Sequence, residues 1–338
     1  MEYKAEDIKT LDWKDHIRLR PGMYIGNLFT YGFWNMILYI IQDSISKTDY
    51  KFQVHIKTKN KVISIFIESN NTELQFKYLE KIEIYLKDSL FGIPVILALS
   101  KESKIEIIFN QKKGKIISQN GIINNVEYAS IKNKKNSTFI EFEIDDTLMQ
   151  VDNLNFDYLC NNIQKFAYSA KNISFICEDI PTNQLRKFYY QNGIKDLFNL
   201  KNFEFLNNDN HRLYLTTKIN EYEYMICINL NGYKHGQPNI TYANNHLTIE
   251  GGSLENGIKK GVISAVQKYK KIKKEESNLF YYDKKYYLKY CLFIVAQFKG
   301  ENINYAGSTK DKIEMPKIEK DISNFIYEEV LKYLTLTF

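Results

Sequence analysis

Helical and strand periodicities alternate along the first part of the chain. Residues 33–46 (FWNMILYIIQDSIS) repeat apolar positions with a helical period, and residues 52–67 alternate as two strands around a Lys-Asn turn. Residues 78–100 have a helical pattern in which Pro94 should lie near a helix start, because an interior proline removes a hydrogen bond. The pattern therefore predicts a helix, a hairpin and a second helix, in that order.

Alternation of apolar and polar residues returns after residue 100. We expect a hairpin of strands 104–110 and 115–119 joined by a Lys-Lys-Gly turn, then a strand at 137–144 and an amphipathic helix at 156–169. Helix-rich sequence gives way to long alternating strands near residue 200, after Asn192-Gly193 and next to a polar run at 207–211. The predicted domains are therefore residues 1–200 and 201–338.

The second predicted domain has the pattern of a βαβ crossover in a mixed sheet, since strands are followed by a long helix and a further strand. The expected elements are strands at 212–219 and 221–230, a Gly-Gly turn at 251–252, a helix at 254–274 and a strand at 290–298.

Length and composition support two globular domains. The chain has 338 residues, 44% hydrophobic and 25% charged, with no apolar run of the roughly 18 to 20 residues that cross a bilayer. We therefore expect a soluble protein without a membrane partner. The N-terminus has no apolar signal segment, and the four cysteines are far apart, which predicts buried thiols and a cytoplasmic location. The five histidines lack zinc-site spacing, and a net charge of +6 does not establish nucleic-acid binding.

The segment Arg20-Pro21-Gly22-Met23-Tyr24-Ile25-Gly26 has no ordinary explanation as a generic helix or strand. It resembles the opening of the B subunits of DNA gyrase and topoisomerase IV. That resemblance implies an α+β two-domain fold: a GHKL (Bergerat) α/β sandwich behind an N-terminal arm, followed by a transducer domain of the ribosomal-protein-S5-like βαβ type. Tyr3 falls where the family's exchange arm carries a tyrosine that closes over the partner subunit's nucleotide.

Three later segments resemble the same family in the same order. Tyr242-Ala243-Asn244-Asn245 with Glu250-Gly251-Gly252 is similar to the transducer signature, and residues 307–312 are similar to the loop whose lysine, here Lys310, reaches the ATP γ-phosphate. Asn136-Ser137-Thr138 resembles the family's Thr-Gly-Thr segment, with Thr138 at a position that helps bind adenine. The resemblance covers nearly the whole chain. The family's cleavage domain has no counterpart before Phe338, so any topoisomerase role is expected to need a partner.

The departures from the family pattern fall on the nucleotide chemistry. The family's helix carries a general-base glutamate and a magnesium-binding asparagine, and alignment places Tyr39 and Asp43 at these positions. A tyrosine with a pKa near 10 is a poor base at neutral pH, so we expect no catalytic residue here. Asp43 could still hold magnesium through its carboxylate.

The aspartate that accepts the adenine amino hydrogen falls on Ile67, which cannot accept it, and the glycines that follow it in the family are missing from residues 68–71. Of the glycine-rich lid only Gly92 has a counterpart, although phosphate-binding loops need glycines for close backbone approach. We therefore expect ATP binding and hydrolysis to be lost. The residual nucleotide-binding candidates are Tyr3, Asp43, Glu68, Gly92, Thr138 and Lys310.

Plainer interpretations exist for the same residues. A surface lysine such as Lys310 is more often simply solvated, and Asp43 and Glu68 are more often caps or surface charges than a residual metal pair.

Three hypotheses for function remain open. The first is a catalytically degenerate, stand-alone relative of the gyrase B ATPase and transducer region, without a cofactor. It would act by protein contact, as a homodimer or a heterodimer with a topoisomerase subunit, to modulate or mimic a B subunit. The second is a weak ATPase whose rebuilt site binds ATP and Mg²⁺ and supports DNA topoisomerase activity. The third is a DNA-clamp module, whose DNA binding would fall steeply with salt.

Overall fold

The computed structural model divides the chain into two compact units. The first comprises residues 1–167 and 172–189, and the second comprises residues 168–171 and 190–338. The domain boundary predicted at residue 200 lies within helix α8 (Ile194–Phe203). The structure describes residues 11–45, 53–68, 72–77, 79, 81–82, 92–132, 134–151, 154–203, 211–231, 238–273, 283–307 and 310–337.

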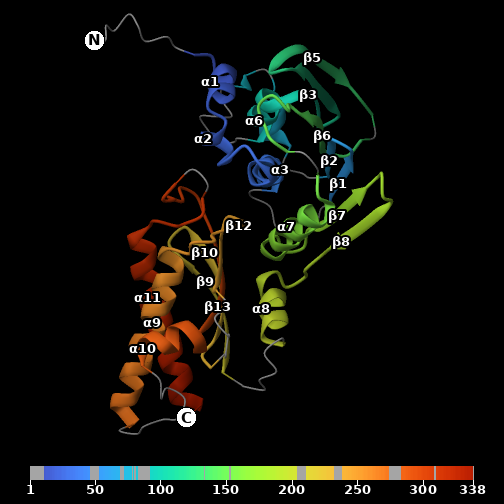
Figure 1. The fold of residues 1–338 in the computed structure, drawn as a ribbon. Coiled ribbons are helices and arrows are strands. Elements are labelled where there is room, and N and C mark those ends of the chain that lie inside the picture. The colour runs from blue at the N-terminus through green and yellow to red at the C-terminus, as the bar shows by residue number, and fades with distance from the viewer. Residues whose placement is uncertain are drawn as a thin grey trace, which may run out of the picture. The chain divides into compact units, whose positions relative to one another are not determined.

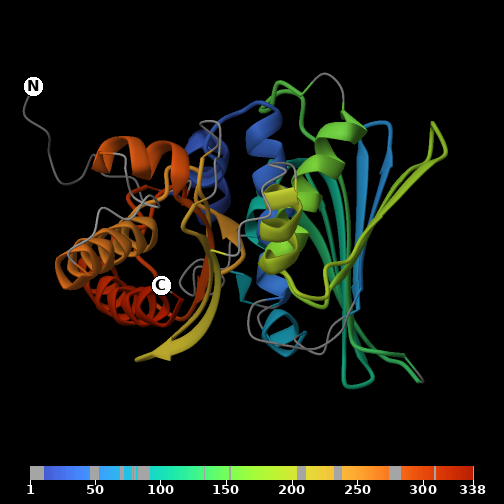
Figure 2. The same cartoon turned by 90° about the horizontal axis from the view of Figure 1, so that it is seen from below.

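A mixed sheet of eight strands forms the first unit, in the order β5-β4-β3-β6-β2-β1-β7-β8 (Figure 1). Its strands are β1 (Gln53–Lys59), β2 (Val62–Glu68), β3 (Ser100–Phe109), β4 (Lys112–Gln119), β5 (Ile122–Ser130), β6 (Ser137–Ile144), β7 (Ser174–Asp179) and β8 (Gln184–Phe188). Its helices are α1 (Trp13–Leu19), α2 (Gly22–Ile25), α3 (Thr30–Ile45), α4 (Glu73–Lys77), α6 (Gly92–Leu99) and α7 (Phe156–Ser169). Figure 2 shows α3 and α7 on the same face of this sheet.

Helix α3 is the centre of this unit. Every residue from Gly32 to Ile41 on it is buried, as expected for a helix whose sequence is apolar on all sides. The predicted helix at 33–46, the first hairpin, the strand at 137–144 and the helix at 156–169 are all confirmed. Of the predicted helix at 78–100, residues 92–99 form α6, with Pro94 in its first turn, whereas Ser100 already begins β3 and Leu79 lies in a turn. Residues 78, 80 and 83–91 lie outside the described residues.

The second hairpin differs from its prediction. Its turn is formed by Asn110 and Gln111, which have φ angles of 47° and 63°, and Lys112 already begins β4. Asparagine tolerates the left-handed conformation that such a turn requires, so the turn lies two residues earlier than the Lys-Lys-Gly pattern indicates. The sequence pattern also did not predict strands β5, β7 and β8.

The second unit is built on a sheet in the order β12-β11-β13-β10-β9. Strand β11 pairs in parallel with β13, and α9 lies between them in sequence, which confirms the predicted crossover in a mixed sheet. Helix α11 was not predicted. The elements, besides α8, are β9 (Arg212–Ile219), β10 (Tyr222–Asn229), β11 (Ile240–Ala243), β12 (His246–Leu247), α9 (Ser253–Lys273), α10 (Lys284–Tyr286), the π-helix η3 (Tyr287–Cys291), β13 (Phe293–Lys299) and α11 (Pro316–Thr337).

Both faces of this second sheet are covered. Alternate residues of β10 point to opposite sides, so Ile226 and Ile228 pack with α9 and α11 in one cluster, whereas Cys227 packs with Phe198 of α8 in another. Helices on both sides leave the central strands buried: six of the seven residues of β13, Phe293 to Phe298, are buried. This explains why β13 is apolar from Phe293 to Ala296 without alternation, and why its Gln297 is buried as well.

An ion pair in the first unit gives a pH-dependent prediction. Arg18 Nη2 lies 3.0 Å from Asp145 Oδ2, and Asp145 is buried. Burial raises the pKa of Asp145, but hydrogen bonds from Thr147 and Arg18 outweigh it and hold that pKa below its usual value. A carboxyl with a lowered folded-state pKa stabilises the fold above its unfolded pKa, and the contribution is lost as pH falls through the folded pKa.

We therefore expect wild type to be more stable than Asp145→Asn at neutral pH, with the difference shrinking below about pH 4. Urea unfolding of both proteins across this pH range measures the effect. A difference that stays constant down to pH 2 would contradict the assignment.

All four cysteines are buried and free, as predicted. Within the described ranges, no helix combines the length and apolarity needed to cross a bilayer.

Candidate functional site

The Arg20–Gly26 segment is held by side chains of α3. Tyr39 donates a hydrogen bond from its hydroxyl to the Tyr24 carbonyl oxygen at 2.9 Å, and Asn35 Nδ2 donates to the Ile25 carbonyl oxygen at 3.0 Å. Gly26 then ends the segment with a φ of 87°, a conformation that favours glycine. The motif thus fixes the short helix α2 against the central helix of the unit.

Tyr39, at the position of the family's general base, is a buried structural side chain. It is 3% exposed, and its hydroxyl must act as donor toward a backbone carbonyl. A hydroxyl used in this way is not positioned as a proton acceptor for an attacking water.

Asp43 binds the start of helix α6. Its Oδ2 accepts a hydrogen bond from the Gly92 backbone N–H at 2.7 Å. A Cβ atom on Gly92 would lie 2.8 Å from Asp43 Oδ2 and 2.9 Å from the backbone of Ile40, so glycine is required by close packing of α6 on α3. Two of the predicted nucleotide-binding residues are therefore in contact with each other, in the arrangement of a helix cap.

Removing this cap should lower the stability of the first unit. We expect Asp43→Ala to reduce the free energy of unfolding by about 1 kcal/mol, the usual cost of losing a carboxylate cap. Asp43→Asn retains an acceptor oxygen and should cost less than half as much. Urea unfolding followed by tryptophan fluorescence measures both variants, since Trp13 and Trp34 both lie in the first unit. Equal losses for the two variants would contradict a capping role.

The two positions aligned with adenine recognition are neighbours in the sheet. Ile67 of β2 lies opposite Thr138 of β6 in the strand register, and both side chains are buried. The sequence-based alignment therefore brought together two residues that the fold also brings together.

Thr138 is the start of a buried relay of hydrogen bonds, which we call the Thr138 relay. Thr138 Oγ1 donates to Gln75 Oε1 at 2.5 Å, and Gln75 Nε2 donates to Ser44 Oγ at 2.8 Å. Ser44 in turn donates to the Ile40 carbonyl oxygen at 2.8 Å. Thr138, Gln75 and Ser44 are each at most 2% exposed. The side chain of Gln75 thus connects the sheet to α3.

Sequence reasoning missed Gln75 and Ser44. A glutamine in a short helix after a strand carries no pattern of its own, since polar residues of this kind are mostly exposed. Only the packing of α4 over the sheet reveals its burial. Gly114 of β4 permits that packing, because a Cβ there would lie 3.3 Å from the Phe76 ring of α4 and 2.2 Å from the side chain of Leu79, which follows α4.

The other predicted residues have separate environments. Glu68 pairs on the surface with Lys135, at 2.5 Å. Lys310 is in the second unit, where its Nζ lies 6.0 Å from the centre of the Tyr305 ring. Tyr3 lies outside the described residues. Across the described part of the chain, no group of three or more His, Cys, Asp or Glu side chains could hold a metal ion.

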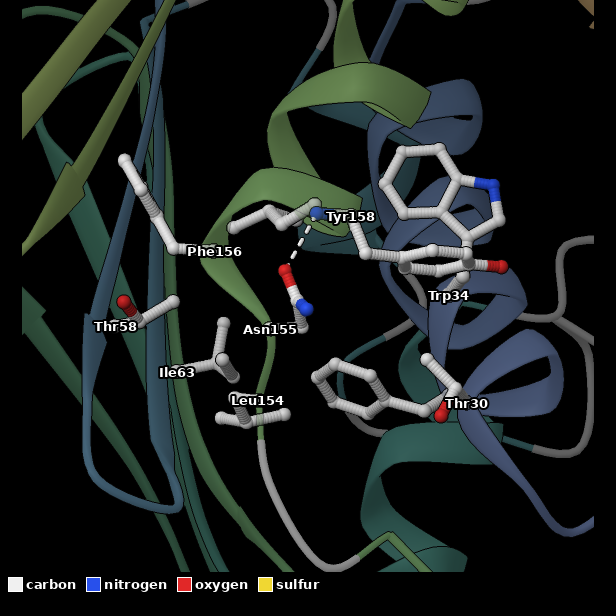
Figure 3. Close-up of a pocket in the computed structure, with 10 residues that line it drawn as sticks. Thr30, Trp34, Thr58, Ile63, Leu154, Asn155, Phe156 and Tyr158 are labelled. Atoms are coloured by element: carbon white, nitrogen blue, oxygen red, sulfur yellow. Dashed lines mark hydrogen bonds between the residues drawn. The ribbon is translucent and has the colours of Figure 1, made fainter.

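A pocket elsewhere in the first unit lies among α3, the first hairpin and the start of α7. Figure 3 shows Trp34, Ile63 and Leu154 around it, and the Tyr158 amide donating to Asn155 Oδ1 at 2.9 Å. Its volume of about 20 Å³ accommodates about one water molecule. The pocket is too small for a nucleotide and shares no residue with the predicted site.

The second-unit motifs also have structural roles. Asn244 and Asn245 form the left-handed turn between β11 and β12, with φ angles of 46° and 67°. The Asn244 side chain exchanges two hydrogen bonds with the backbone of Gly300, at 2.7 and 3.0 Å. Gly252 has a φ of 109°, and a Cβ on it would lie 2.2 Å from the Ile313 carbonyl oxygen.

Comparison with known proteins agrees with this architecture. The family model described as DNA gyrase B matches residues 193–337, within the second unit. The gyrase B protein from Myxococcus xanthus superposes with a TM-score of 0.76, at 14% identity, over 95% of this chain and 95% of that chain. The chain has a gyrase B-like fold.

Two further solved structures are similar to this gyrase B-like chain. The 43K ATPase domain of Thermus thermophilus gyrase B, solved with an aminocoumarin, has a TM-score of 0.74 at 17% identity, covering 96% of this chain and 90% of that one. The ATP-binding domain of Francisella tularensis topoisomerase IV, solved with a small-molecule inhibitor, has a TM-score of 0.75 at 17% identity, covering 96% and 92%. The predicted fold, a GHKL sandwich with a transducer domain, is therefore confirmed.

Curated relatives match nearly the whole chain at low identity. The B subunit of topoisomerase IV from Streptococcus pneumoniae is 22% identical over 98% of this chain and 55% of its own length. The B subunit of DNA gyrase from Campylobacter jejuni is 24% identical over 98% of this chain and 46% of its own length. The gyrase B-like chain thus spans about half the length of the relatives that it matches.

Proposed function

We propose that this chain is a catalytically degenerate relative of the gyrase B ATPase and transducer region that acts by protein contact. One observation carries the proposal: the polar groups aligned with nucleotide recognition form hydrogen bonds with other groups of the protein. The Thr138 hydroxyl donates a hydrogen bond to Gln75, and the Asp43 carboxylate accepts one from the Gly92 amide. Such a site completes its hydrogen bonds without a ligand, whereas a binding site keeps groups available for one.

Magnesium ATP does not fit these residues. Ile67 offers no acceptor for the adenine amino group, and the Thr138 hydroxyl is already a donor to Gln75. Asp43 is the candidate magnesium ligand, but one of its oxygens is committed to the α6 amide. Tyr39 donates to a carbonyl in place of accepting a proton. Each departure removes a different part of the chemistry, which supports loss of the activity as a whole.

The proposed role follows from what is retained. The opening segment and the transducer turns build the fold, so the gyrase B-like surfaces remain while the nucleotide site does not. We propose that the protein pairs with itself or with a topoisomerase subunit in the cytoplasm, and modulates or mimics a B subunit without hydrolysing ATP.

Calorimetric titration with magnesium and a non-hydrolysable ATP analogue tests the proposal. We expect no binding heat at about millimolar nucleotide, and no change in sedimentation of the same samples. Binding by wild type, with or without assembly, would overturn the proposal. Gln75→Ala is a useful companion variant: it releases the Thr138 hydroxyl but restores neither an acceptor at residue 67 nor a base at residue 39, so it too should fail to hydrolyse ATP.

A further inference from the structure

Strand β5 is an edge strand of the eight-stranded sheet. It is the last strand in the sheet order, and among the described strands it pairs only with β4. Eight of its nine residues are exposed. Along such an edge, alternate residues direct their N–H and C=O groups away from the sheet, where another strand can bind them.

Edge strands are usually blocked by proline, lysine or pronounced bulges. Strand β5 (IINNVEYAS) contains neither proline nor lysine, and Glu127 is its only charged residue. Its one irregularity lies near Asn124, where the register with β4 shifts; from Asn125 to Ser130 the pairing is regular. Val126 and Tyr128 in this part are 37% and 45% exposed. The second half of β5 therefore presents a regular backbone edge with exposed apolar side chains.

An open groove of about 440 Å³ lies beside this half of the strand. Tyr128, Ala129 and Ser130 form one side, and α4 contributes the other. The Phe76 and Tyr128 rings meet edge to face with centroids 6.0 Å apart. A side chain of an added strand could enter this groove and contact both rings. The lining residues are Phe76, Lys77, Lys112, Tyr128, Ala129 and Ser130.

Positive charge is concentrated around the same edge. Residues 109–136 contain six lysines and one glutamate, a net charge of +5, whereas the whole chain has a net charge of +6. Three of these lysines are paired, with Glu106, Glu127 and Glu68. Lys112, Lys132 and Lys134 are exposed. Charge complementarity therefore favours an acidic partner at this edge.

We propose that β5 binds an acidic, extended segment of a partner protein, which adds to the sheet as a ninth strand. Backbone hydrogen bonds along residues 125–130 would supply the pairing, the groove would accept an apolar or aromatic side chain, and Lys112, Lys132 and Lys134 would attract the carboxylates. The inference rests on the proposed function in one respect, because it names the partner chemistry for a protein that acts by contact.

Single-stranded nucleic acid is the competing ligand class, since lysines beside exposed aromatic rings also suit phosphates and bases. The backbone edge distinguishes the two. A nucleic acid lacks the alternating donors and acceptors that pair with the N–H and C=O groups of a strand, whereas a peptide strand pairs with them directly. The observations therefore favour the peptide.

The test uses the full chain and a fluorescein-labelled synthetic peptide that alternates glutamate with valine around a central tyrosine. We expect saturable binding by fluorescence anisotropy at low salt, and about tenfold weaker binding by a Lys112→Glu, Lys134→Glu double variant. The matched control carries the same charge change elsewhere on the sheet. Lys59→Glu with Lys187→Glu alters exposed lysines at the end of β1 and on the opposite edge strand β8, and should change binding less than twofold.

Two further arms separate the explanations. N-methylation of alternate backbone nitrogens, in two peptides that cover both alternations, should abolish binding in one peptide, because one set of N–H groups faces β5. Absence of binding at millimolar peptide, equal loss in the control variant, or unchanged binding of both N-methylated peptides would overturn the proposal. Tighter binding of an oligothymidylate that the Lys112→Glu, Lys134→Glu variant loses would assign the edge to nucleic acid instead.

Adding magnesium and the ATP analogue to the same samples keeps the two proposals separate. Nucleotide binding heat would contradict the degenerate site whatever the peptide does, and loss of the peptide result alone would leave the nucleotide conclusion standing.

Discussion

Replacement of Gly261 by valine is expected to lower the free energy of unfolding of the second unit by about 3 kcal/mol. Gly261 lies in the middle of α9, where this helix packs against α11. A Cβ at this position would lie 2.6 Å from the Ser323 carbonyl oxygen and 2.7 Å from the Ile326 Cβ. Both neighbours belong to α11, and one of them is backbone, so the helices must separate to admit any side chain.

Gly257, one turn earlier, has the same relation to α11, because its Cβ would lie 2.7 Å from the Glu319 carbonyl oxygen. Alanine at an open helix position normally stabilises by up to about 1 kcal/mol. Gly261→Ala should therefore lower the free energy of unfolding, although the helix propensity of alanine alone would raise it. Gly307→Ala is the matched control, since nothing lies within 4 Å of its Cβ and its φ is not positive. It should change stability by less than about 0.5 kcal/mol.

The chain offers a direct way to assign the unfolding transition. Its two tryptophans, Trp13 and Trp34, both lie in the first unit. Circular dichroism in urea follows both units, whereas tryptophan fluorescence follows the first. The valine variant should shift the dichroism transition to lower urea. If Gly261→Val left that transition in place, the close α9–α11 contact would be wrong.

Introducing the family's general base, by Tyr39→Glu, is expected to destabilise the first unit by about 3 to 5 kcal/mol and to give no ATP hydrolysis. Tyr39 is 3% exposed among apolar neighbours of α3, and its hydroxyl donates to Tyr24. A glutamate there would bury a carboxylate next to the Tyr24 carbonyl oxygen, which cannot donate a hydrogen bond to it. The residue type that catalysis needs is thus incompatible with the present packing.

Tyr39→Phe is the control for this prediction. It removes the hydroxyl while keeping the ring, and should cost about 1 kcal/mol, the usual net value of one hydrogen bond. Urea unfolding followed by tryptophan fluorescence gives the stabilities, and a phosphate-release assay gives the activity. A stable Tyr39→Glu protein that hydrolyses ATP would contradict both the packing argument and the proposed function.

The pattern of apolar and polar residues was sufficient to predict those elements whose own residues carry a clear helical or strand period. Helix α7 has the predicted bounds, and α9 begins one residue before its predicted start. The crossover between β11 and β13 followed from element order alone. Strand β5 was missed because its Asn-Asn pair interrupts the alternation, and the regular pairing resumes only after the register shift. A strand of this kind is specified by its neighbour β4 more than by its own residues.

The candidate site was predictable in its positions and not in its contacts. The alignment placed residue 67 and Thr138 at one site, and the strand register puts them opposite each other. It could not show that Gln75 bonds Thr138, because that contact depends on how a five-residue helix packs over the sheet. Asp43 illustrates the same limit: its carboxylate suits magnesium, yet the donor that it binds is the backbone of Gly92.

The Thr138 relay bears on whether the protein responds to ATP concentration. Its donors all point one way, from the sheet through Gln75 to a carbonyl of α3, so the chain of bonds is complete with no solute present. Under the proposed function, the spacing between α3 and the sheet does not change with ATP concentration. The influence of the protein on a partner would then be set by the amount of protein that the cell makes.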